Sequence, residues 1–328
     1  MDKTEKIQIL QDITNKSISL KEVSKILEIP EMEVLGLVHE LRNYGINISL
    51  QKRNDDIYML NHGEKDFKGD QNIHKLQTDE NNEFRFVAIS DTRIGSKSQQ
   101  LSILNDIYLK AYELGYNNVI LCGNISEGLY SLTDDMSQEN FLNNTADQID
   151  YITTNYPHIS DITTYFITGI KDYTHLKTNK INLGKRISNV RPDMIYLGHN
   201  SVMINIDNVN MLVLCSKLKK TYTVSYRPQQ QVASFRSEDK PDIILYGGLL
   251  QMDKLSYRNV TTLSIPSVCA TTKEMRDKRY NNTIGAWYIT IRTDKYGKLA
   301  NMSVIDSVYY KTNKDDYTKK RVLKINTR

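Results

Sequence analysis

The chain has 328 residues, with 43 Lys and Arg against 39 Asp and Glu, so its formal net charge is +4. This near balance argues against a protein that coats nucleic acid through charge alone. Hydrophobic residues make up 39% and charged residues 25%, as in an ordinary globular protein, and no apolar run reaches the roughly 18 residues of a membrane helix.

The N-terminal segment and the cysteines bear on the cell compartment. The first ten residues, MDKTEKIQIL, lack the uninterrupted apolar core of a secretory signal, so we expect a cytoplasmic protein. Cys122, Cys215 and Cys269 lie far apart in apolar segments. This spacing excludes a disulfide framework or a cysteine-rich zinc site and predicts three buried thiols.

Residues 1–61 have the pattern of a winged helix-turn-helix domain. Apolar residues at helical spacing predict a first helix, and Ser19 and Glu22 form a capping-box pattern that opens a second. Pro30 opens a third helix. Two short strands follow, and the turn between them would be the wing. These strands are expected at residues 46–50 and 57–60.

The charge of this domain leaves its partner open. The third helix of such domains often enters the DNA major groove, but here it begins with Glu31 and Glu33, which phosphates would repel. Residues 1–62 carry eight basic and ten acidic side chains, so weak DNA binding and a protein interaction fit equally well. The residues expected to contact DNA are Arg42, Lys52 and Arg53.

Residues 62–83 are polar and have no clear period, so we expect a linker. From residue 84 to residue 310, apolar strands alternate with helices and then follow one another directly, which predicts a layered α/β sandwich. Helices are expected at 99–114 and 138–155. Strands are expected at 84–89, 118–122, 164–168, 194–197, 201–206, 211–215, 243–246, 261–265 and 287–293. Residues 311–328, with seven Lys and Arg against two Asp, are expected to form a basic, solvated tail.

Several strands of the sandwich end in polar turns that contain glycine, which is where open α/β folds place their sites. Three such turns are Asp91-Thr92-Arg93-Ile94-Gly95, Gly123-Asn124 with Gly128 further on, and Gly169-Ile170-Lys171-Asp172. Two further segments are Leu214-Cys215-Ser216 and residues 240–250, KPDIILYGGLL. In order and spacing these segments resemble the calcineurin-like metallophosphoesterase family. The likeness is to phage or bacterial DNA-repair-exonuclease-like members, some of which carry an N-terminal winged helix.

The resemblance implies an α/β/β/α metallophosphoesterase-like sandwich, in which two divalent metals clamp a phosphate and supply a hydroxide. The chain departs from the family pattern at most of the positions concerned. Arg93 replaces the first His, Asn124 the bridging Asp, Ile170 the ligand Asn, Lys171 the catalytic His, Cys215 the strand-end His, and Gly248 and Leu250 the last two His. Of the ligands only Asp91 remains, and Asp172 is kept as a supporting residue.

These departures predict that the metal centre is lost. One carboxylate cannot hold two metals, and Arg93 and Lys171 would repel them. We therefore expect no metal, no cofactor and no enzymatic activity, with Arg93 or Lys171 paired to Asp91 or Asp172 instead. An alternative keeps the loops as an anion site that binds phosphate without cleaving it. Its cations would be Arg93, Lys171, Lys217, Lys219 and Lys220.

Three functions follow from this pattern. The first is a non-catalytic scaffold or regulator of phage or mobile-element origin, which binds DNA or a protein and could form a homodimer, without a membrane partner. The second is a sequence-specific winged-helix transcription regulator. The third is a metal-dependent nuclease or phosphodiesterase with an altered carboxylate site. Its candidate carboxylates are Asp91, Glu127, Asp172 and Asp242.

Overall fold

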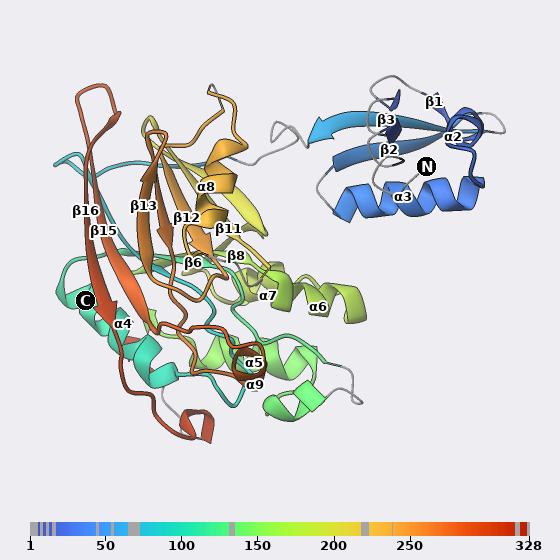
Figure 1. The fold of residues 1–328 in the computed structure, drawn as a ribbon. Coiled ribbons are helices and arrows are strands. Elements are labelled where there is room, and N and C mark those ends of the chain that lie inside the picture. The colour runs from blue at the N-terminus through green and yellow to red at the C-terminus, as the bar shows by residue number, and fades with distance from the viewer. Residues whose placement is uncertain are drawn as a thin grey trace. The chain divides into compact units, whose positions relative to one another are not determined.

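The computed structural model describes residues 6, 9–10, 13–14, 18–43, 46–53, 56–64, 73–130, 135–217, 223–237, 239–318 and 322–326. The chain divides into two units, residues 1–71 and 72–328 (Figure 1). No helix within the described ranges has the length and apolar character that crossing a membrane requires.

The smaller unit packs helices α2 (Leu20–Leu27) and α3 (Glu31–Asn43) against a three-stranded antiparallel sheet. Its strands β1 (Ile18–Ser19), β2 (Ile46–Arg53) and β3 (Asp56–Glu64) lie in the order β1-β3-β2. The side chain of Ser19 accepts from the backbone N–H of Glu22, whose carboxylate accepts from the backbone N–H of Ser19. This capping box fixes the start of α2 where the sequence predicts it.

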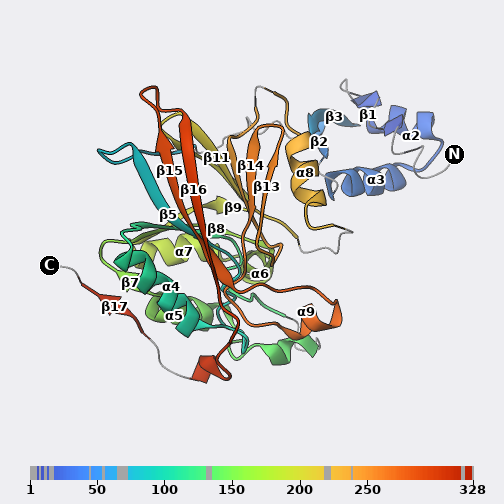
Figure 2. The same ribbon diagram turned by 60° about the vertical axis from the view of Figure 1, so that its left-hand side comes forward.

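The larger unit contains two six-stranded sheets (Figure 2). The strands of the first are β5 (Glu83–Ile89), β6 (Asn118–Cys122), β8 (Thr163–Thr168), β9 (Met194–His199), β15 (Gly285–Thr293) and β16 (Leu299–Val308), in the order β16-β15-β5-β6-β8-β9. The strands of the second are β4 (His74–Leu76), β10 (Ser201–Ile206), β11 (Val209–Cys215), β12 (Ile243–Gly247), β13 (Asp253–Tyr257) and β14 (Val260–Ser264), in the order β13-β14-β12-β11-β10-β4. Strands β7 (His158–Ile159) and β17 (Lys324–Ile325) form a separate parallel pair.

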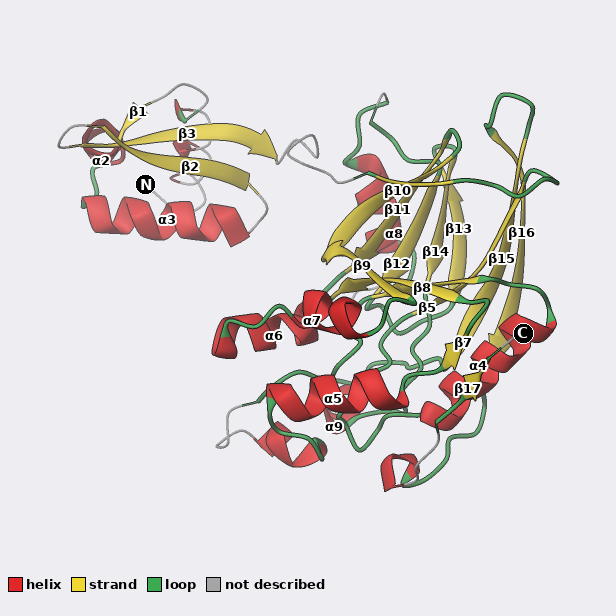
Figure 3. Ribbon diagram, turned by 180° about the vertical axis from the view of Figure 1, so that it is seen from behind, coloured by secondary structure: helices red, strands yellow, loops and turns green. Residues whose placement is uncertain are grey.

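Helices cover the outer faces of both sheets (Figure 3). The first sheet packs against α4 (Leu101–Glu113), α5 (Thr145–Asn155) and α7 (Leu183–Val190), and the second against α8 (Tyr226–Ala233). Two further helices are α6 (Ile170–Asn179) and α9 (Lys273–Asp277), and short 3₁₀ turns are η1 (Asp135–Glu139) and η2 (Asp316–Thr318).

The alternation of side chains along the strands builds two cores. In β5, Phe86 and Ala88 face the second sheet, whereas Val87 and Ile89 face the helices. Strands β5 and β6 in the middle of the first sheet are therefore buried on both sides, and their sequences are almost continuously apolar. The predicted α/β/β/α sandwich is confirmed.

Two segments differ from their expected form. Within the predicted linker, β4 pairs in parallel with β10 and extends the second sheet. Within the predicted solvated tail, Leu323 and Ile325 pack against the core, and β17 pairs with β7. Both segments are polar overall, but each contains a few apolar side chains that pack at an edge of the sandwich.

Candidate functional site

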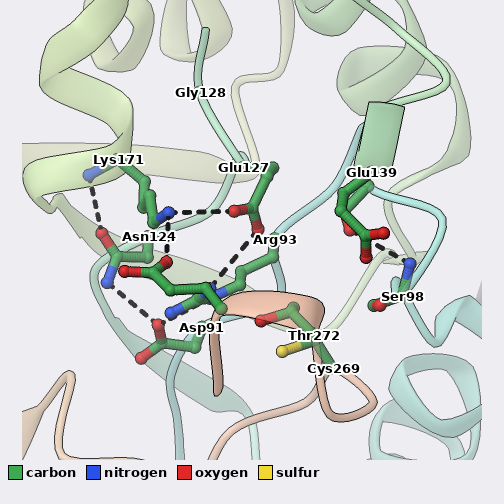
Figure 4. Close-up of polar contacts among 12 residues, drawn as sticks. Asp91, Arg93, Ser98, Asn124, Glu127, Gly128, Glu139, Lys171, Cys269 and Thr272 are labelled. Carbon is green, nitrogen blue, oxygen red and sulfur yellow. Dashed lines mark hydrogen bonds and ion pairs between the residues drawn. The ribbon is translucent and has the colours of Figure 1, made fainter. Parts of the chain in front are cut away.

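The candidate site lies where the parallel strands of the first sheet reach their carboxyl ends (Figure 4). Asp91 follows β5, Asn124 follows β6, and Lys171 lies in the first turn of α6, directly after β8. Because neighbouring parallel strands end at the same edge of a sheet, these three side chains come together.

The backbone of the site is strained and tightly packed. Asp91, Arg93 and Asn124 have left-handed φ values of 50°, 45° and 55°, which cost about 1 kcal/mol or more in residues other than glycine. A Cβ atom on Gly169 would lie 2.3 Å from Oδ1 of Asn124, so only glycine fits there. The surrounding structure therefore holds these loops in one conformation.

Asp91 is fully buried and surrounded by donors. Its Oδ1 accepts from Nε of Arg93 at 3.1 Å and from Nδ2 of Asn124 at 3.0 Å, and its Oδ2 accepts from Oγ of Ser90 at 2.8 Å. Asn124 is held from its other side, because its Oδ1 accepts from the backbone N–H of Lys171 at 3.1 Å. The carboxylate of Asp91 thus faces a guanidinium and an amide of the protein itself.

Arg93 links two buried carboxylates. Its side chain is 3% exposed, and Nη1 lies 3.5 Å from Oε2 of Glu127, an atom that has no hydrogen-bond partner among the described residues. Burial lowers the pKa of the guanidinium, but the carboxylates of Glu127 and Asp91 outweigh that effect and hold the pKa well above its ordinary value. Arg93 therefore pairs with Asp91, as the sequence predicts.

Lys171 lies at the side of the network that is partly exposed to solvent. Its Nζ lies 3.0 Å from Oε1 of Glu127 and 2.9 Å from Oε2 of Glu274, and it also donates to the hydroxyl of Tyr130. Glu274 has a second ion pair with Lys278 at 2.8 Å. Burial would raise the pKa of Glu274, but the ammonium of Lys171 and its hydrogen bonds outweigh burial and lower the pKa to about 2. Sequence reasoning paired Lys171 with Asp91 or Asp172, and the structure pairs it with Glu127 and Glu274 instead.

The network is balanced in charge, with three carboxylates facing three cations. The carboxylates belong to Asp91, Glu127 and Glu274, and the cations to Arg93, Lys171 and Lys278. Arg93 and Lys171 therefore donate to carboxylates of the protein and are not presented to an external anion. This differs from the expectation that they form part of a phosphate-binding site. Sequence reasoning missed Glu274 and Tyr130, because they come from segments that carry no motif.

Asp172 joins the loop after β6 to the start of α6. It accepts from the backbone N–H groups of Gly169 at 2.7 Å, Ser126 at 2.8 Å and Ile125 at 3.2 Å. Burial raises the pKa of Asp172 to about 6, although these hydrogen bonds oppose the rise. Its role is to hold the two loops together.

Cys215 and Gly248 adjoin this network: the thiol of Cys215 packs against Gly123 and Gly169, and the backbone N–H of Gly248 lies 3.4 Å from Oγ of Ser90. Cys215 ends β11 and is buried, Leu250 is buried against Cys269 and Met275, and Gly248 packs against the backbone of Ser216. Ile170 is partly exposed at the start of α6. Of the expected contact residues, Lys217 is exposed after β11. Lys219, Lys220 and the side chains of Arg42, Lys52 and Arg53 lie outside the described residues.

The residues present do not fit the metal pair that the resemblance implies. The guanidinium of Arg93 and the amide of Asn124 occupy one oxygen of Asp91, the ligand that remains. Asp242 accepts from the backbone of Asn210 at the opposite ends of the strands. In the described part of the chain, no group of three His, Cys, Asp or Glu side chains is arranged to hold a metal ion.

No protein-family model and no curated protein matches the chain. Solved structures do resemble it in fold. A protein described as a novel archaeal phosphodiesterase is 11% identical, over 69% of this chain and 99% of that chain, with a TM-score of 0.39. Vps29 from Entamoeba histolytica, complexed with zinc, is 10% identical over 68% and 98%, with a TM-score of 0.35. A predicted phosphoesterase from Streptococcus pneumoniae is 8% identical over 69% and 98%, with a TM-score of 0.32.

These similarities correct the expectation that the chain is not an enzyme. That expectation rested on the replaced family ligands, yet two of the similar structures are described as a phosphodiesterase and a phosphoesterase. The replaced ligands bear only on a two-metal mechanism. They say nothing about chemistry that other side chains could carry on the same fold, so the inference from lost ligands to lost activity was wrong.

Proposed function

We propose that the chain is a regulator that binds DNA, and that its smaller unit is a winged helix-turn-helix domain. The observation that carries the proposal is the order of elements β1, α2, α3, β2 and β3 with the sheet order β1-β3-β2. In winged helices this order places the helix before the hairpin in the major groove and the hairpin against the backbone. We extend the proposal to the phage or mobile-element origin that the resemblance implies.

The position of three basic residues supports DNA as the partner. Arg42 lies on α3, and Lys52 and Arg53 end β2, next to the turn of the hairpin. Contacts from a hairpin tip to phosphates position a protein on the duplex and make its affinity depend on salt. Binding is expected to be weak, because the first turn of α3 carries Glu31 and Glu33.

Fluorescence anisotropy with a labelled duplex, measured over a series of salt concentrations, tests this proposal. For Lys52→Ala/Arg53→Ala, we expect the slope of log affinity against log salt to fall by about 1.8, or about 0.9 for each lost phosphate contact. The matched control is Lys295→Ala/Lys298→Ala, which removes the same charge from the turn between β15 and β16. If the two double variants bind duplex equally, or if wild type does not bind at low salt, the proposal fails.

A protein partner for the same unit is the second candidate. The first turn of α3 exposes Met32, whose exposed fraction is 78%, between Glu31 and Glu33. An exposed apolar side chain flanked by carboxylates suits a basic protein surface better than a phosphate backbone. Met32→Asp should then weaken capture of that partner in a pull-down and leave duplex binding unchanged.

A further inference from the structure

Helices α6 and α7 and the end of β9 present a surface that the network of the candidate site does not use. We call it the α6–α7 surface, and its residues are Tyr173, Lys177, Lys180, Lys185, Arg186 and His199. All six side chains are exposed. The surface combines one aromatic pair with four cations, which are the two ingredients of single-strand recognition.

The aromatic pair is formed by Tyr173 of α6 and His199 of β9. Their rings are stacked, with 5.0 Å between centroids and 25° between planes, yet Tyr173 is still 45% exposed. The hydrogen bond between Nδ1 of His199 and Oγ1 of Thr168, at 3.1 Å, fixes the orientation of the imidazole. Partial burial of the ring lowers the pKa of His199, which favours the uncharged imidazole. The pair is therefore a pre-oriented, uncharged platform with ring area open to solvent.

The four cations flank the turn between the two helices. Lys177 and Lys180 lie at the end of α6, and Lys185 and Arg186 in the first turn of α7. Among the described residues, no carboxylate forms an ion pair with any of them.

Three carboxylates of the adjoining segments are already engaged. Asp172 is buried beneath backbone N–H groups, Arg191 binds Asp193, and Asp147 accepts from Asn144. The six residues of the α6–α7 surface themselves include four cations and no carboxylate.

The placement of two of these cations is unfavourable for the fold. The amino end of a helix carries a partial positive charge, so cations in the first turn are repelled and carboxylates are preferred. Helix α7 has Lys185 and Arg186 there and no acidic residue. A bound anion would offset this repulsion, whereas the folded chain alone gains nothing from it.

We propose that the α6–α7 surface binds single-stranded DNA. The Tyr173–His199 pair stacks an unpaired base, and the cations around the helix turn contact the neighbouring phosphates. A duplex fits less well, because its bases are already stacked on each other and cannot lie on the platform. The exposed stacked rings likewise favour a nucleobase over an acidic protein as the occupant. This inference goes beyond the proposed function, which concerns duplex binding by the other unit.

The test is anisotropy of the full chain with labelled dT20. For Lys177→Glu/Lys180→Glu, we expect the salt slope to fall by about 1.4, because each phosphate contact with a single strand contributes about 0.7. Tyr173→Ala should weaken binding about fivefold or more through loss of a stacked base, and Tyr173→Phe should bind like wild type. Both Tyr173 variants keep the net charge, so they separate stacking from electrostatics.

Matched controls keep this test separate from that of the proposed function. Lys295→Glu/Lys298→Glu makes the same change of charge beside another exposed aromatic residue, Tyr296. If it weakens dT20 binding as much as Lys177→Glu/Lys180→Glu does, the α6–α7 surface is not the site. Absence of dT20 binding at low salt overturns the inference and points to a protein occupant. Lys52→Ala/Arg53→Ala should leave dT20 binding intact, so duplex and single-strand binding can fail independently.

Discussion

Arg93 shows how one side chain decides the stability of the candidate site. For Arg93→Met we expect a loss of about 3–5 kcal/mol in the free energy of unfolding, because Asp91 and Glu127 stay buried without their cation. Urea denaturation measures this. The control Arg292→Met removes a guanidinium that is 62% exposed, and should cost less than about 1 kcal/mol. Equal losses of unfolding free energy for the two variants would show that the buried ion pairs of Arg93 stabilise the fold no more than an exposed pair does.

Glu274 makes part of the stability depend on acidity. Its pKa is lowered from an ordinary 4.5 to about 2 in the folded chain, so its contribution is complete above pH 4.5 and is lost as the pH falls toward 2. The difference in unfolding free energy between wild type and Glu274→Gln should therefore shrink over that interval. The pKa of Asp172 is raised, so its contribution to stability is lost as the pH rises from about 4 to about 6. Asp172 titrates in both proteins, so this contribution cancels in the difference. A constant difference from pH 6 to pH 2.5 would contradict the ion pair.

At the residue scale, the sequence predicted the ion pair of Arg93 with Asp91 and misjudged the partners of Lys171. Asp91, Arg93 and Asn124 could be placed together because each follows a recognisable apolar strand. The partners of Lys171 could not be predicted, because Glu274 lies more than a hundred residues away on a short helix without a motif. The approach of such distant groups depends on tertiary packing, which no local pattern encodes.

At the scale of elements, burial on both faces decided what the sequence could predict. After Asn118, strand β6 is an uninterrupted apolar run, and β12 is one throughout; both were placed within a residue of their bounds. Strands β13 and β16 were missed, because they lie at sheet edges and alternate with polar residues. Helix α6 was missed because it buries little beyond Asp172 and His175.

Strand β17 tests whether the C-terminal segment is part of the fold. Ile325 packs against the core, whereas the neighbouring Lys324 is exposed. We expect Ile325→Ala to lower the free energy of unfolding by about 1–2 kcal/mol and Lys324→Ala to change it by less than about 0.5 kcal/mol. Thermal unfolding of both variants provides the measurement. An unchanged midpoint for Ile325→Ala would mean that β17 is not held in solution.

At the scale of the whole molecule, two units with separate cores predict two unfolding transitions. The core of the smaller unit includes Leu27, Val34 and Met59, and the larger unit has its own cores on both sides of its first sheet. Leu27→Ala should cost about 2–5 kcal/mol and lower only the transition of the smaller unit. Calorimetry distinguishes this from a single shared transition, in which the variant would shift the whole curve.

The three cysteines of the larger unit make its opening measurable by thiol labelling. Cys122, Cys215 and Cys269 are all buried, and burial raises the pKa of each thiol, so the reactive thiolate is both scarce and inaccessible in the folded chain. A thiol reagent can modify them only when the sandwich opens. The rate of labelling then counts openings of the sandwich, while the smaller unit, which contains no cysteine, can unfold without being recorded.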